Sequence, residues 1–77
     1  MVDAYVLIQA EVGKGTKVAH EIVGIKGVHS ADVVTGPYDV IARVEAGSIN
    51  DLGTLIVAQI QALDGVTRTL TCPVLRL

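Results

Sequence analysis

The sequence contains no tryptophan and no phenylalanine, and its only aromatic residues are two tyrosines. The interior of the protein must therefore be filled by Val, Ile, Leu and Ala, and apolar residues make up 51% of the 77-residue chain. A chain of this length buries only about 60% of the surface that its unfolded form exposes. Because a body this small cannot hide so much aliphatic surface, we expect a homo-oligomer.

Cysteine, clustered positive charge and long apolar runs are also scarce. The single Cys72 permits no internal disulfide framework, which fits a reducing compartment. The six Lys and Arg residues are scattered and the net charge is −2, so we expect no direct contact with nucleic acid. No apolar run approaches the roughly 20 residues that span a bilayer, and no leader pattern opens the chain. These absences predict a cytoplasmic protein that does not associate with membranes.

The spacing of apolar residues predicts the order strand, helix, strand, strand, helix, strand. Alternation predicts strands over residues 4–11, 28–35, 38–45 and 66–75. Thr16 is the expected N-cap of a first helix that ends near Ile25. Ser48, with Asp51 three residues later, matches a relaxed capping box. The helix that follows carries the clearest apolar stripe of the chain, at Ile49, Leu52, Ile56, Ile60 and Leu63.

This order predicts one α+β domain over residues 1–77. Gly36-Pro37 joins the second and third strands in an antiparallel hairpin. The Gly27-Val28 pair is repeated as Gly65-Val66, which indicates a weak internal duplication. The expected fold is ferredoxin-like, βαββαβ, with a four-stranded antiparallel sheet and two helices on one face, of the dimeric α+β barrel type.

Alternation along the last strand assigns its side chains to the two faces of the sheet. We expect Leu70 and Cys72 to face the helices, Cys72 as a small buried apolar residue. Thr67, Thr69 and Thr71 are then expected on the opposite face. A face that is half aliphatic and half hydrogen-bonding suits a subunit interface better than open water.

The titratable residues give no pattern for catalysis. His20 and His29 are not spaced with other residues as a metal set or as a base and its nucleophile. We therefore expect surface histidines, no catalytic residues, no metal and no cofactor.

Two short motifs carry a resemblance to a known family. The first is Val-Thr-Gly-Pro-Tyr-Asp-Val at 34–40, and the second is Gly-Val-Thr-Arg-Thr-Leu-Thr at 65–71. Together they resemble the effector-binding domain of the Lrp/AsnC (feast/famine) transcription regulators, over nearly the whole chain. The resemblance implies a non-catalytic regulatory domain that binds an amino acid.

In that family, two domains are understood to pair sheet face to sheet face, and the dimers assemble into rings, often octamers. A free amino acid or a related small molecule binds between dimers, near the glycine turn and the last strand. By position, the implied contacts in this chain are Gly36, Tyr38, Asp39, Thr69 and Thr71, with Thr35 as a weaker candidate. The chemistry is reasonable, because turn amides can donate to a carboxylate and Asp39 could pair with an ammonium group.

The resemblance also implies what the chain does not carry. Met1 stands just ahead of the first strand, so we expect a stand-alone form that lacks the helix-turn-helix. Such a chain would modulate transcription through its own assembly or by co-assembly with full-length Lrp/AsnC regulators. Two alternatives stay open: an ACT-like regulatory module of a metabolic enzyme, and a small ferredoxin-like enzyme such as a monooxygenase or isomerase.

Overall fold

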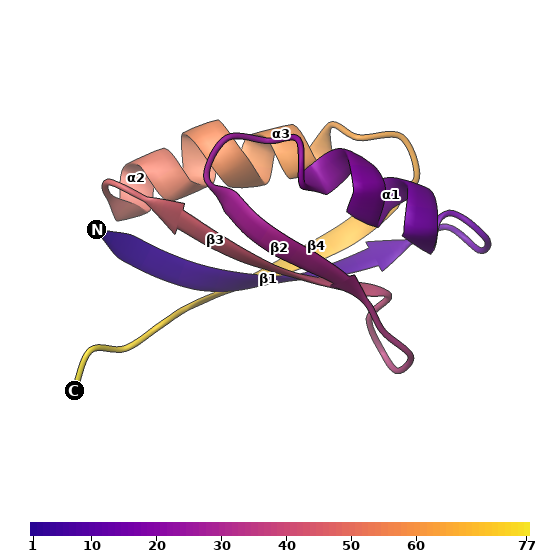
Figure 1. Cartoon of the computed structure of the whole chain (residues 1–77), viewed down its shortest axis with the longest axis horizontal. Helices are drawn as coiled ribbons and strands as arrows, with labels where there is room; N and C mark the ends of the chain where they lie inside the picture. Colours follow the sequence, from indigo (N-terminus) through magenta and orange to yellow (C-terminus); the bar gives the residue numbers. More distant parts are fainter.

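The four strands form one antiparallel sheet in the order β2-β3-β1-β4, and the helical segments cover one of its faces (Figure 1). The computed structural model describes all residues from 1 to 77. The elements are β1 Val2–Ala10, α1 Gly15–Ile22, β2 Val28–Val33, β3 Val40–Ala46, α2 Ile49–Asp51, η1 Leu52–Val57, α3 Ala58–Gln61 and β4 Val66–Pro73. The predicted order of elements, the hairpin of β2 and β3 and the ferredoxin-like fold are confirmed.

The ends of several elements differ from the predicted ones. α1 begins at Gly15 after Lys14, which makes no side-chain capping bond, so the predicted cap at Thr16 is wrong. β2 ends at Val33 and β3 begins at Val40, because the connection between them is a six-residue loop rather than a two-residue turn. β4 ends at Pro73, which cannot donate a backbone hydrogen bond and lies on an edge strand, as expected.

The second helical segment begins where the capping box predicted. The Ser48 hydroxyl accepts a hydrogen bond of 3.0 Å from the backbone N–H of Asp51. Periodicity did not predict the wider turn that follows, a π-helix over Leu52–Val57 that separates α2 from α3. Leu52, Ile56 and Ile60 still reach the core from this segment, whereas Ile49 is exposed.

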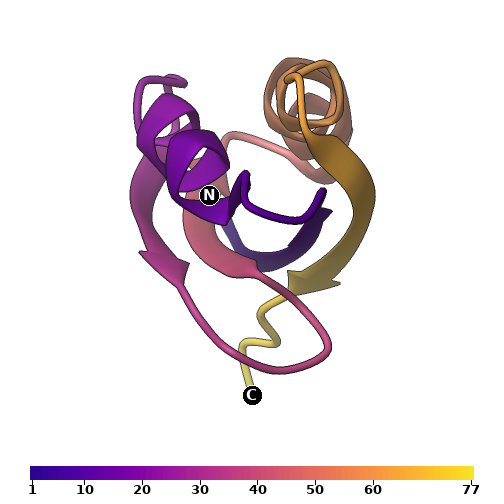
Figure 2. The ribbon, with the colours of Figure 1, turned by 90° about the vertical axis from the view of Figure 1, so that its right-hand side faces the viewer.

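The core is a single aliphatic layer between the sheet and the helices (Figure 2). It contains side chains of β1 and β3, the two central strands, together with α1 and the second helical segment. Its fully buried members include Val6, Ile8, Val18, Ile22 and Ile60. The opposite face of the sheet carries no helix, so half of the sheet surface has no partner within the chain.

The register of β4 reverses the predicted faces of that strand. Leu70 pairs with Leu7 and Thr69 pairs with Ile8, so Thr69 lies on the helix side and Leu70 on the open side. Cys72 also lies on the open side and is exposed, so its predicted burial is wrong. In a strand with a threonine at every second position, either the threonines or the residues between them can face the helices. The pairing with β1 decides which of the two sets does so.

Four charged side chains tie the start of α1 to the turn before β4. The Asp64 carboxylate lies 3.3 Å from the Lys14 ammonium and 3.5 Å from that of Lys17. The hydrogen bond from Lys14 is the main reason why the pKa of Asp64 lies below its usual value. The pKa of Lys14 is raised, first by its hydrogen bond to Glu11 and then by Asp64.

We expect Asp64→Asn to lower the melting temperature slightly at neutral pH and not at strongly acidic pH. A carboxyl whose pKa is lowered by folding stabilises the protein above its unfolded pKa, and this contribution is lost as the pH falls through the folded pKa. The effect is small because these side chains are exposed. Thermal unfolding across acidic pH measures it, with Asp32→Asn as the control, since Asp32 is exposed and has no ion pair. If the melting temperatures of both variants depended on pH in the same way, the ion pairs of Asp64 would not stabilise the fold.

Candidate functional site

The loop of residues 34–39 between β2 and β3 carries four of the six predicted ligand contacts. Thr35 and Gly36 are exposed, and Tyr38 and Asp39 are half-buried. Gly36 has a φ of 144°, which favours glycine. Figure 2 shows that the loop extends beyond the sheet on the side away from the helices.

Hydrogen bonds to the end of β1 hold this loop in place. The N–H of Asp39 donates to the Ile8 carbonyl over 2.9 Å, and the N–H of Ala10 donates to the Asp39 carboxylate over 2.7 Å. The Gln9 side chain donates to the Pro37 carbonyl over 3.2 Å. Asp39 therefore has a structural role, with one carboxylate oxygen bound to the backbone and the other without a partner in the chain.

The two predicted contacts on β4 lie under the second helical segment. The Thr69 hydroxyl accepts a hydrogen bond of 2.9 Å from the Gln61 side chain of α3. Thr71 and Pro73 line one side of a groove of about 220 Å³. The other wall of this groove, which we call the β4 groove, is formed by Ile49, Leu52, Gly53 and Val57.

One chain does not bring the two halves of the predicted site together. Val40, Ile8 and Thr69 form one row across three strands, so Thr69 lies two strand spacings, roughly 10 Å, from the strand that follows the loop. Thr69 and Thr71 also face the helices, whereas the loop extends past the other face of the sheet. A ligand can touch both the loop and the β4 groove only if they come from different copies of the chain.

The helical wall of the β4 groove is a feature that sequence reasoning missed. Part of its signal was present, because Leu55, Val57 and Ala58 make the helix more apolar than a single core stripe requires, and Val57 of these three lines the groove. The groove itself depends on Thr71 facing the helix, which is the point on which the predicted faces of β4 were wrong.

The open face of the sheet combines aliphatic and cationic side chains. Leu7 and Ile41 are half-buried, and Tyr5 and Leu70 are 40% and 45% exposed. The Arg43 guanidinium donates to the Tyr5 hydroxyl over 2.7 Å and lies 5.3 Å from the centre of its ring. This mixture has the composition of a protein interface.

Asp3 is the one charged residue that is buried, with 8% of its surface exposed. Its carboxylate is paired with Arg43 at 3.5 Å and with Arg76 beyond the end of β4. A buried carboxylate requires such partners.

The two histidines are both exposed, as expected. His20 lies on α1, and the His29 ring lies 3.2 Å from the Glu45 carboxylate. No helix of the structure has the length and apolar character required to cross a membrane.

A family model described as the Lrp/AsnC ligand binding domain matches residues 3–77. A helix-turn-helix transcriptional regulator of Pyrococcus furiosus is 30% identical over 71 residues, which cover 88% of this chain and 47% of the regulator. The chain thus spans about half the length of such curated relatives. A crystal structure of a Thermus thermophilus protein superimposes with a TM-score of 0.91 at 31% identity, covering 100% of this chain and 96% of the other.

An enzyme also contains a similar stretch. Homocitrate synthase of Sulfolobus acidocaldarius is 38% identical over 61 residues, which cover 79% of this chain but only 13% of the enzyme.

Proposed function

Because this chain belongs to the family of Lrp/AsnC ligand-binding domains, we propose that it is a non-catalytic amino-acid sensor whose effector site is completed by a second copy. The observation that carries the proposal is the position of the two half-sites. The 34–39 loop and the β4 groove lie on opposite sides of one sheet, so a shared ligand needs two chains.

The chemistry of each half suits a different part of an amino acid. The free oxygen of the Asp39 carboxylate would accept from the ammonium group, and exposed amides around Gly36 would donate to the carboxylate. The β4 groove offers the Thr71 hydroxyl and apolar contacts from Leu52 and Val57 for the side chain of the effector.

Assembly would occur through the open face. We propose that two copies pair with these faces together, which removes Leu7, Ile41 and Leu70 from water, and that dimers then join into a larger ring, such as an octamer. The chain would influence transcription by changing its own assembly or by joining full-length regulators of the family, without touching DNA itself.

The test of the shared site is complementation between two defective chains. The ligand is the amino acid that raises the melting temperature of the wild-type chain most in a thermal-shift panel. Tyr38→Ala alters the loop half of the site and Thr71→Val alters the groove half. Each variant alone should lose binding of that amino acid. Chains of both variants, unfolded and refolded together, should recover binding at a fraction of the sites, because some interfaces then combine two intact halves. Isothermal titration measures this recovery.

No recovery in assemblies that mass spectrometry shows to be mixed would place the site within one chain and overturn the proposal. If the wild-type chain binds none of the proteinogenic amino acids, the proposal that its effector is an amino acid is wrong.

Leu70→Asp should dissociate the assembly to monomers at micromolar concentration. The change places a charge on the open face, opposite Leu7 of the central strand β1, where pairing of the two faces would remove it from water. Leu55→Asp is the matched control, since Leu55 is 57% exposed on the helix side. Light scattering coupled to size exclusion gives the mass. An unchanged mass for Leu70→Asp would mean that another surface joins the subunits.

A second candidate function is supported by the similar stretch in homocitrate synthase. A domain of this kind within an enzyme favours the use of this chain as an effector-binding subunit of a metabolic enzyme. Co-purification separates the two functions, because it would recover a helix-turn-helix regulator in one case and an enzyme in the other.

A further inference from the structure

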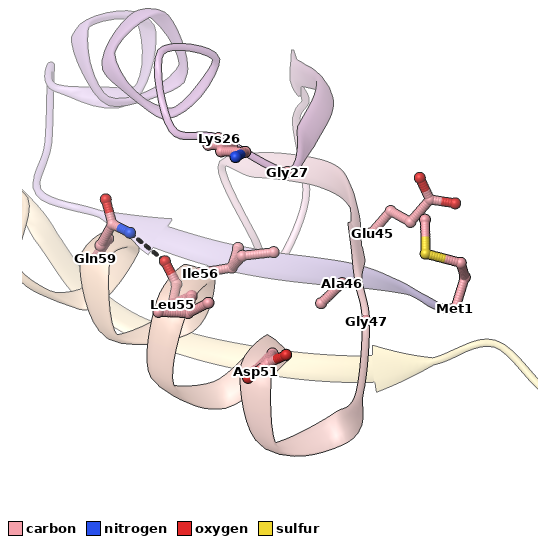
Figure 3. A pocket seen from close by; sticks show the side chains of 10 residues that line it. All are labelled: Met1, Lys26, Gly27, Glu45, Ala46, Gly47, Asp51, Leu55, Ile56 and Gln59. Carbon is pink, nitrogen blue, oxygen red and sulfur yellow. Dashed lines mark hydrogen bonds between the residues drawn. The ribbon is translucent and has the colours of Figure 1, made fainter.

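A second hollow lies at the other end of the sheet from the 34–39 loop. It has a volume of about 350 Å³ and lies between the turn that follows α1, the end of β3 and the second helical segment (Figure 3). Lys26 and Gly27 line its upper side, and Asp51 lines its lower side. The effector site proposed above uses none of these residues.

The charges of this hollow are separated. Figure 3 shows Lys26 and Asp51 on opposite sides, with Ala46, Leu55 and Ile56 between them. The ion pairs and side-chain hydrogen bonds of the chain involve neither the Lys26 ammonium nor the Asp51 carboxylate. Met1 and Glu45 also line the hollow, and the Glu45 carboxylate lies 3.2 Å from the His29 ring. Lys26 and Asp51 are therefore the two charged side chains of the lining that have no partner in the chain, and an apolar surface lies between them.

Local backbone features keep the hollow open. Gly27 has no side chain, and a Cβ atom there would lie only 2.7 Å from the Ile56 Cδ1 atom in the wall. Leu55 and Ile56 belong to the π-helix η1, which widens the helix at this wall. Such wide turns are rare in proteins and are frequent at functional sites.

We propose that this hollow binds a small linear zwitterion, with its carboxylate at Lys26, its ammonium group at Asp51 and its aliphatic chain on Leu55 and Ile56. Both ends are needed, because Asp51 disfavours a simple anion and Lys26 disfavours a simple cation. The size and the mostly apolar lining are typical of small-molecule sites. The site lies within one chain, so it does not depend on assembly.

The experiment is a titration followed by the amide resonances of the ¹⁵N-labelled chain. The probes are ω-amino acids of increasing length, from 4-aminobutyrate to 6-aminohexanoate, with hexanoate and hexylamine as single-charge controls. We expect saturable shifts of the Gly27, Gly47 and Leu55 amides with one or more of the zwitterions at millimolar concentration. Lys26→Gln and Asp51→Asn should each weaken binding about tenfold, the loss of one charge-assisted contact.

Three controls keep the outcome decisive. Lys17→Gln removes a lysine outside the hollow and should leave the affinity unchanged. Leu55→Trp fills the hollow from an exposed position and should abolish the shifts in a folded chain. Tyr38→Ala should have no effect here, which separates this site from the amino-acid site. Equal shifts with hexanoate or hexylamine, or no saturable shift with any zwitterion, would overturn the proposal.

Discussion

Gly27→Ala is expected to lower the free energy of unfolding by roughly 2–5 kcal/mol, a large share of the stability of a domain this small. Gly27 has a φ of 97°, a conformation that an alanine adopts only with strain. Its Cβ would lie 2.7 Å from Ile56 Cδ1 and 2.9 Å from the Glu45 carbonyl oxygen. Ile56 is itself buried in the core, so it has little room to withdraw. Urea denaturation followed by circular dichroism measures the change.

Two other glycines separate the causes of this loss. Gly13 has a similar φ of 82°, but no atom lies within 4 Å of the position that a Cβ would take. Gly13→Ala should therefore cost only the backbone strain of about 1–2 kcal/mol. Gly53→Ala lies in an exposed helical position with free space around it and should be neutral or stabilising by up to about 1 kcal/mol. If Gly27→Ala cost no more than Gly13→Ala, the contact with Ile56 would not limit the space there.

Ile56→Asp is expected to destabilise the chain by about 3–5 kcal/mol and to leave much of it unfolded. Ile56 is 2% exposed and packs between the helix and the sheet, where a carboxylate has no cationic partner. Leu55→Asp is the matched control, because the neighbouring side chain is 57% exposed and its substitution should cost less than about 1 kcal/mol. Thermal and urea unfolding of the two variants give the comparison. Equal stability would mean that the helix presents a different stripe to the core.

Much of the fold could be predicted because local signals agreed with one another. The Ser48 cap, the Gly-Val pairs that stand at the start of β2 and β4 and the alternation in β1 all point to the same order of elements. The stripe of Leu52, Ile56 and Ile60 also reached the core as predicted. The π-turn within that stripe was not predictable, because spacings of three and four residues fit a regular helix equally well.

The faces of β4 could not be read from the strand alone. Leu70 was assigned to the core because it is apolar, yet the open face is apolar as well. The choice is made by the pairing of Leu70 with Leu7, and a break in the β1–β4 register lies nearby, between Gln9 and Ala10. Because a shift of one residue exchanges the two faces, no property of β4 by itself decides the outcome.

The candidate site was predictable only in part for the same reason. The loop was found from a local motif, and its position between β2 and β3 is as expected. The β4 groove joins Ile49 and Val57 of the helix to Thr71 of the strand, residues that come together only in the folded chain. Whether the predicted residues hold a ligand stays a prediction until the complementation experiment is done.

The bond between Asp3 and the segment beyond β4 has a consequence for rearranging the chain. The Val74 N–H donates to the Asp3 carbonyl over 2.8 Å, and Arg76 is paired with the Asp3 carboxylate, so the two ends of the polypeptide run beside each other. A short peptide linker could join these ends, and the exposed turn at Gly13 could be cut instead. Such a circular permutant would keep every strand pairing while moving both new termini to the opposite end of the central strand β1, away from Asp3.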